Sequence, residues 1–125
     1  MPGLRLVPGA DASAQASILV RIEADLQQAG VTDDVADRVL IVAGELLANV
    51  AEHGLAPARL GWTVRRDRVD VAVEGAGPRA DAVRSASLPE AAATRGRGLF
   101  LIAALADRLH DAPEGLVATF TTRSG

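Results

Sequence analysis

The spacing of apolar positions predicts three helices. A stripe at helical spacing predicts a helix over residues 12–29, and Gly30 is a typical stop signal. A longer helix is expected over 33–53, because apolar residues fill it and two acids occupy its first turn, where the helix dipole favours them. Residues 98–109 form a third, strongly apolar segment, which we interpret as a helix. The stripe in the first of these helices consists of Ile18, Leu19, Ile22 and Leu26.

Short alternating segments predict the strands. Strands are expected near residues 4–7, over 60–64 and 69–73 with a charged turn between them, and over 116–122. Residues 79–95 are weakly patterned, so we expect a loop with one short helix. The order of elements favours one α+β two-layer sandwich spanning 1–125, with a mixed or antiparallel sheet covered by helices on one face.

Composition narrows the class of protein. The 125 residues are 49% hydrophobic and 23% charged, which is enough for one core. The net charge of -3 argues against general nucleic-acid binding, and the lack of cysteine excludes disulfides and thiol chemistry. We find no apolar run long enough for a membrane span and no signal-peptide pattern, so we expect a cytoplasmic protein.

Polar residues interrupt the most apolar helix at regular spacing. Glu45, Asn49, Glu52 and His53 share one helical face. If this face lines a cleft, Glu45 could act as a base or position a water, and Asn49 could offer oxygen to a hard cation such as Mg²⁺. An ordinary solvated face would show the same spacing, so both interpretations stay open.

Two glycine motifs follow. Gly75-Ala76-Gly77 ends a strand, but the chain is too short for a dinucleotide-binding fold. Gly96-Arg97-Gly98 opens the third helix, whose N-terminal amides could bind phosphate because small residues permit close approach. Each motif alone is a weak signal.

Taken together, these motifs resemble a known family. Residues 45–54 resemble the N box of the GHKL (Bergerat-fold) ATPases and kinases, 74–77 stand at the G1 box, and 95–102 resemble the G2 box. The likeness extends from Leu4 to Thr122. It is greatest to the bacterial anti-sigma-factor serine kinases.

The resemblance implies a site for ATP and Mg²⁺. Glu45 would be the catalytic base, Asn49 the Mg²⁺ ligand, and Glu74 would take the place of an adenine-binding Asp. Residues 79–95 would be the ATP lid. The cofactor-binding set would be Asn49, His53, Glu74, Gly75, Gly77, Arg95, Gly96, Arg97, Gly98, Leu99, Phe100 and Thr119.

The resemblance also implies a function. The chain would be an ATP-dependent serine kinase that phosphorylates a STAS-type anti-anti-sigma partner and sequesters a sigma factor. Because Glu74 replaces Asp, a non-catalytic partner-binding member of the same fold is one alternative. The ATP-binding part of a histidine kinase is another. A homodimer is expected by analogy, through a surface that could equally be core, comprising Leu4, Leu6, Ile18 and Ile22. Trp62 is expected in the core.

Overall fold

Five strands and four helices make up the described chain. The computed structural model describes residues 3–6, 9–53, 57–75, 78–85 and 97–122. In chain order the elements are β1 (Gly3–Leu6), α1 (Ala12–Gln28), α2 (Asp33–His53), β2 (Ala58–Val64), β3 (Arg68–Glu74), α3 (Ala80–Arg84), α4 (Arg97–Leu105), β4 (Arg108–Ala112) and β5 (Gly115–Thr121).

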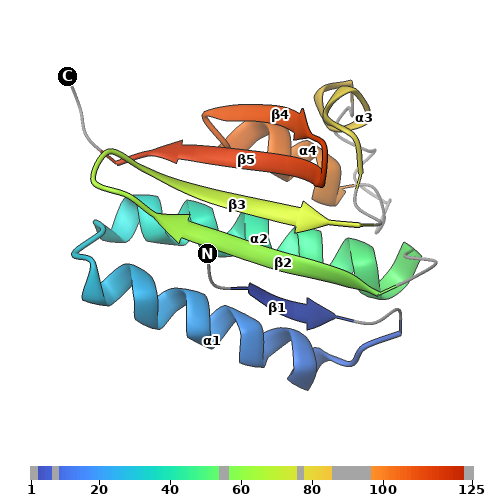
Figure 1. Ribbon diagram of the computed structural model, residues 1–125, viewed down its shortest axis with the longest axis horizontal. Coiled ribbons are helices and arrows are strands. Elements are labelled where there is room, and N and C mark those ends of the chain that lie inside the picture. Colours follow the sequence, from blue (N-terminus) through green and yellow to red (C-terminus); the bar gives the residue numbers. More distant parts are fainter. Residues whose placement is uncertain (1–2, 7–8, 54–56, 76–77, 86–96, 123–125) are drawn as a thin grey trace.

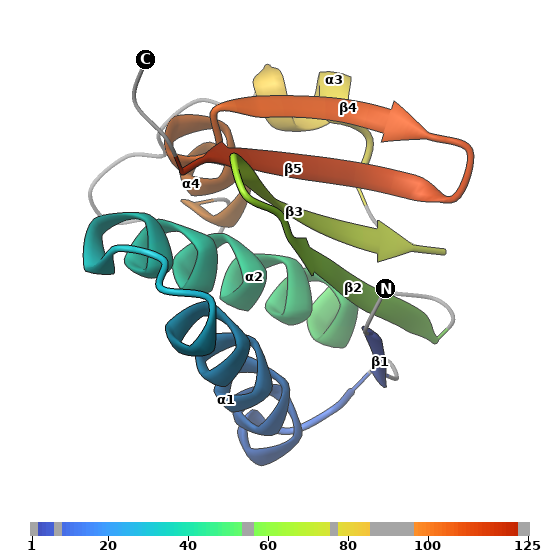
Figure 2. The same ribbon diagram turned by 60° about the vertical axis from the view of Figure 1, so that its left-hand side comes forward.

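The strands form one antiparallel sheet in the order β1-β2-β3-β5-β4. Helices α1, α2 and α4 pack on one face of this sheet (Figures 1 and 2). The expected α+β two-layer sandwich is therefore confirmed, and its sheet is antiparallel rather than mixed.

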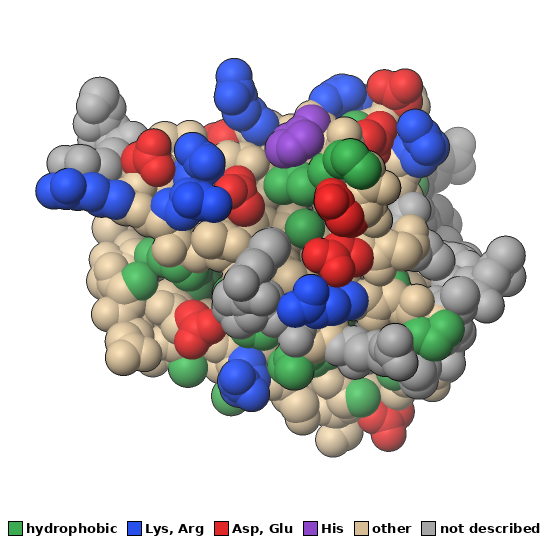
Figure 3. Space-filling model, viewed as in Figure 1, with side chains coloured by type: hydrophobic (Ala, Val, Ile, Leu, Met, Phe, Trp, Pro, Cys, Tyr) green, Lys and Arg blue, Asp and Glu red, His purple; other side chains and the backbone are tan. Residues whose placement is uncertain are grey.

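Strict alternation along the central strands separates the two faces of the sheet. On β3, Val69, Val71 and Val73 are buried in the core, whereas Asp70 and Glu74 lie on the opposite face. Strands β2 and β5 follow the same rule, with residues 58, 60 and 62 and residues 116, 118 and 120 buried. We call the face without helices the open face. Figure 3 shows charged side chains of both signs gathered over it.

The third helix is shorter than predicted. Helix α4 ends at Leu105, and residues 108–112 form edge strand β4, so the predicted helix to Leu109 was wrong at its C-terminal end. The amide of Asp107 donates to the carbonyl of Thr119 at 2.9 Å, and its carboxylate accepts from the amide of Thr121 at 2.7 Å. Pairing with β5 therefore outweighs the helical preference of this apolar segment.

The structure also tests the predictions for Trp62 and for the expected dimer surface. Trp62 is 1% exposed, and its indole N–H donates to Asp25 of α1 at 2.7 Å, which confirms a core role. Ile18 and Ile22 are also core residues, so they are not available to a dimer surface. Leu4 packs partly buried against the core, while the side chain of Leu6 lies outside the described residues. No helix in the described ranges is long and apolar enough to cross a membrane.

Candidate functional site

The structure brings together two motifs that are far apart in the sequence. Helices α2 and α4 pack against each other, and Glu45 of α2 lies half-buried beside the first turn of α4. A Cβ atom added at Gly98 would lie only 2.7 Å from Oε2 of Glu45. The carboxylate therefore occupies the space that the missing side chain leaves, directly against the N-terminal turn of α4.

Asn49 lies one helical turn beyond Glu45 and is also half-buried. Among the described residues, no hydrogen bond or ion pair engages the side chain of Glu45 or Asn49. No buried side-chain oxygen or nitrogen in the described residues lacks a hydrogen-bond partner, so the partnerless oxygens of Glu45 and Asn49 reach solvent. Their oxygens are therefore available to a ligand.

This arrangement fits the phosphate and metal end of a nucleotide. Carboxylate and amide oxygens are the donors that Mg²⁺ prefers, and the N-terminal amides of a helix favour phosphate. Gly98 has no side chain, so the Glu45 carboxylate can lie against the backbone of this turn. Leu99 and Phe100 follow half-buried on the same helix, and Leu99 packs against the core.

Glu74 lies on the opposite side of the sheet from Glu45 and Asn49. Its side chain is on the open face, 33% exposed, and Oε2 accepts from Nη1 of Arg59 at 3.4 Å. The helix-facing neighbour at the end of β3 is Val73, which is 1% exposed. The structure therefore does not bring the Glu74 carboxylate together with Glu45.

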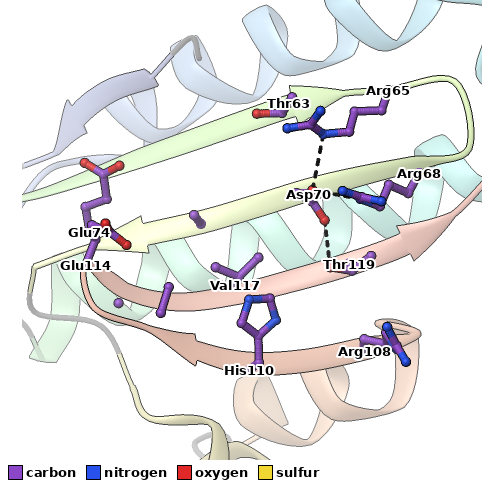
Figure 4. A pocket seen from close by; sticks show the side chains of 13 residues that line it. Thr63, Arg65, Arg68, Asp70, Glu74, Arg108, His110, Glu114, Val117 and Thr119 are labelled. Carbon is purple, nitrogen blue, oxygen red and sulfur yellow. Dashed lines mark hydrogen bonds and ion pairs between the residues drawn. The ribbon is translucent and has the colours of Figure 1, made fainter.

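Thr119 shares the open face with Glu74. Its hydroxyl donates to Oδ1 of Asp70 at 2.7 Å, and Asp70 also pairs with Arg68 at 3.2 Å and with Arg65 at 3.9 Å (Figure 4). The side chain of Thr119 is thus engaged on the opposite face of the sheet from Glu45.

Gly75 forms the turn that ends β3. Its φ of +108° is one that side-chain-bearing residues rarely adopt, and its amide donates to the carbonyl of Glu114 at 3.1 Å. Gly77, Arg95 and Gly96 lie outside the described residues, as do the side chains of His53 and Arg97. Most of the expected lid, residues 86–95, also lies outside them.

Asp70 is the polar residue that reasoning from motifs missed. It anchors the cluster around Thr119, although its sequence neighbours suggested only an ordinary strand. The signal that could have found it is the alternation of β3, which places Asp70 and Glu74 on the same side.

The chain is thus an α+β sandwich domain whose candidate site joins an acid and an amide of α2 to the N-terminal turn of α4. The chain matches the model of the histidine kinase-like ATPase domain over residues 9–122. It therefore belongs to this family, the GHKL family, which includes the anti-sigma-factor serine kinases. Domains of this family bind ATP with Mg²⁺. A comparison with curated proteins found no match.

Proposed function

We propose that this chain is an ATP-dependent protein serine kinase of the anti-sigma type. It would phosphorylate a serine on a small STAS-type partner and bind a sigma factor. The observation that carries the proposal is the contact of Glu45 with Gly98, because it joins an acid–amide face of α2 to a helix N-terminus suited to phosphate.

The residues divide the work as follows. When bound, ATP with Mg²⁺ supplies the phosphoryl group for transfer. Asn49 would hold the metal through its amide oxygen. Glu45 would accept the proton of the serine hydroxyl at a carboxylate oxygen, and the amides at the start of α4 would hold phosphate oxygens in place. Positioning and charge neutralisation are the main requirements of this chemistry.

The end of β3, where the adenine would lie, presents no carboxylate on the helix side of the sheet. Glu74 and Thr119 lie on the open face, and the end of β3 presents the apolar Val73 toward the helices. The nucleotide base would then lack a carboxylate partner from β3, so we expect weak ATP affinity. This observation favours a second candidate, a non-catalytic partner-binding module with the same fold.

Calorimetric titration with ATP and Mg²⁺ separates the two candidates. The kinase predicts saturable, Mg²⁺-dependent binding that Asn49→Ala weakens at least tenfold. Gln27→Ala is the matched control, because it removes an amide from the exposed surface of α1. If the wild-type protein is folded but binds no ATP at millimolar concentration, the kinase proposal fails and the non-catalytic module is favoured.

Phosphoryl transfer itself needs a partner. Incubation with radiolabelled ATP and a purified STAS domain should label a serine on that domain. Glu45→Gln should reduce labelling by about 100-fold or more, the usual range for loss of a general base. Labelling that Glu45→Gln leaves unchanged would contradict the role of Glu45.

A further inference from the structure

We propose that the open face of the sheet is a docking surface for an acidic segment of a protein partner. A hollow of about 620 Å³ lies on this face, lined by residues of β2, β3, β4 and β5 and of the turns before β3 and β5 (Figure 4). It is separated from Glu45 and Gly98 by the sheet itself. Nucleotide binding and this docking can therefore succeed or fail independently.

The shape of the hollow follows from the register of the strands. Ala72 of β3 pairs with Gly61 of β2 and with Val117 of β5, and Val117 pairs with His110 of β4. Small side chains thus fill the central row on β2, β3 and β5, and His110 closes the row on edge strand β4. Larger polar side chains stand in the rows on both sides, so the centre is lower than its two ends.

One end of the hollow carries an excess of positive charge. The side chains of Arg65, Arg68 and Arg108 line this end. Asp70 forms ion pairs with Arg65 and Arg68 at this end. Arg108 is exposed, and no ion pair or hydrogen bond engages its side chain within the described residues. Three guanidinium groups and one carboxylate therefore line this end, and an incoming anion would balance the excess positive charge.

The opposite end of the hollow is acidic. Glu74 and Glu114 line it, and Glu74 is paired with Arg59. Figure 4 shows these two carboxylates at the other end of the strands from the arginines. The face is thus polar along its length, and a complementary segment would place its acids at the arginine end only.

A protein segment suits this surface better than a free anion. The Arg65 and Arg68 side chains are 56% and 44% exposed, so a small anion would pair with them in water, where ion pairs contribute little. An occupant that also covers Ala72 and Val117 would exclude water from the charges and bury apolar surface. Both effects require a ligand the size of a peptide strand.

The test uses a fluorescein-labelled peptide with three glutamates followed by three small apolar residues. We expect anisotropy to show binding that weakens with salt, and a peptide with glutamines in place of the glutamates to bind at least tenfold more weakly. In amide NMR spectra the shifts should map to the central row around Ala72 and Val117.

Matched charge reversals decide the location. Arg108→Glu should weaken peptide binding at least tenfold. Arg21→Glu, which makes the same change on the exposed surface of α1, should leave it within twofold. Equal effects of the two variants, absence of binding at 1 mM peptide, or shifts confined to the helices would overturn the proposal. So would sedimentation data in which Arg108→Glu dissociates a dimer of the free protein, because the face would then join two copies.

Discussion

Gly98→Ala tests whether the contact between α2 and α4 serves ligand binding rather than folding. The added Cβ would meet Oε2 of Glu45 at 2.7 Å, whereas ordinary contact begins near 3.4 Å. The carboxylate must therefore retreat by about 0.7 Å, the difference between these two distances. It is the end of a flexible side chain, so it can move by rotating.

The cost to folding is small by this reasoning. Moving Glu45 off its rotamer costs about 0.5–1.5 kcal/mol. Replacing a helical glycine by alanine stabilises a helix by about 0.5–1 kcal/mol. The free energy of unfolding should therefore change by less than about 1 kcal/mol, which urea denaturation followed by circular dichroism can measure.

The cost to function is larger. A catalytic group displaced by about 1 Å can lose roughly 100-fold in rate, and the new methyl group also narrows the approach to the α4 backbone. We expect Gly98→Ala to weaken Mg²⁺–ATP binding at least tenfold by calorimetry. Where a STAS substrate is phosphorylated, we expect the rate to fall by about 10- to 100-fold.

Gly44→Ala is the matched control for Gly98→Ala. It places a Cβ on α2 at an ordinary 3.8 Å from Leu19, so it should stabilise the protein by about 0.5–1 kcal/mol and leave ATP binding unchanged. Two results would refute the reasoning. One is a folded Gly98→Ala protein with wild-type ATP affinity, and the other is a loss of several kcal/mol of stability from Gly98→Ala.

Three further substitutions test the sheet and its faces. Gly115→Ala should destabilise the protein by about 3 kcal/mol or more in urea denaturation, because φ is +151° and a Cβ would collide with a backbone carbonyl of β3. Asp25→Ala should lower the free energy of unfolding by about 1–3 kcal/mol in the same assay, because the Trp62 indole N–H loses its acceptor. An unchanged denaturation midpoint would contradict this expectation. Thr119→Val should lower the free energy of unfolding by about 1–2 kcal/mol, because it removes the hydrogen bond to Asp70. The same variant should keep its ATP affinity, measured by calorimetry, within twofold of the wild-type value. A large loss of affinity would instead place Thr119 at the nucleotide.

The elements that were predicted correctly are those specified by local periodicity. Helix α2 runs from Asp33 to His53 as expected, since its start signal and apolar content lie within one segment. Residues 108–112 could not be assigned in this way. Their strand depends on hydrogen bonds to β5, and nothing in the composition of Leu99 to Leu109 marks where the helix should stop.

In the candidate site, too, local spacing was predictable and contacts between distant segments were not. Glu45 and Asn49 share a helical face by spacing alone, so their proximity was predictable. The resemblance implied only that Glu45 and Gly98 belong to one nucleotide site, and their contact was not predicted because it depends on how α2 packs against α4. Motif position also suggested Glu74 and Thr119, but a motif fixes position along the chain and leaves open the face on which a strand residue lies.

The alternation of side chains along β3 determines on which face of the sheet Glu74 lies, and one contact with a ligand would not outweigh it. Successive side chains of β3 alternate, so turning Glu74 toward the helices would turn Val69, Val71 and Val73 out of the core. Each buried valine contributes about 1.5–3 kcal/mol, so the three together outweigh the roughly 1.5–3 kcal/mol of one charged hydrogen bond. The chain therefore keeps Val73 on the helix side and Glu74 with Arg59. If this protein binds ATP, the base must be recognised by groups other than the Glu74 carboxylate, while Glu45 and Asn49 remain suited to the phosphates and their metal.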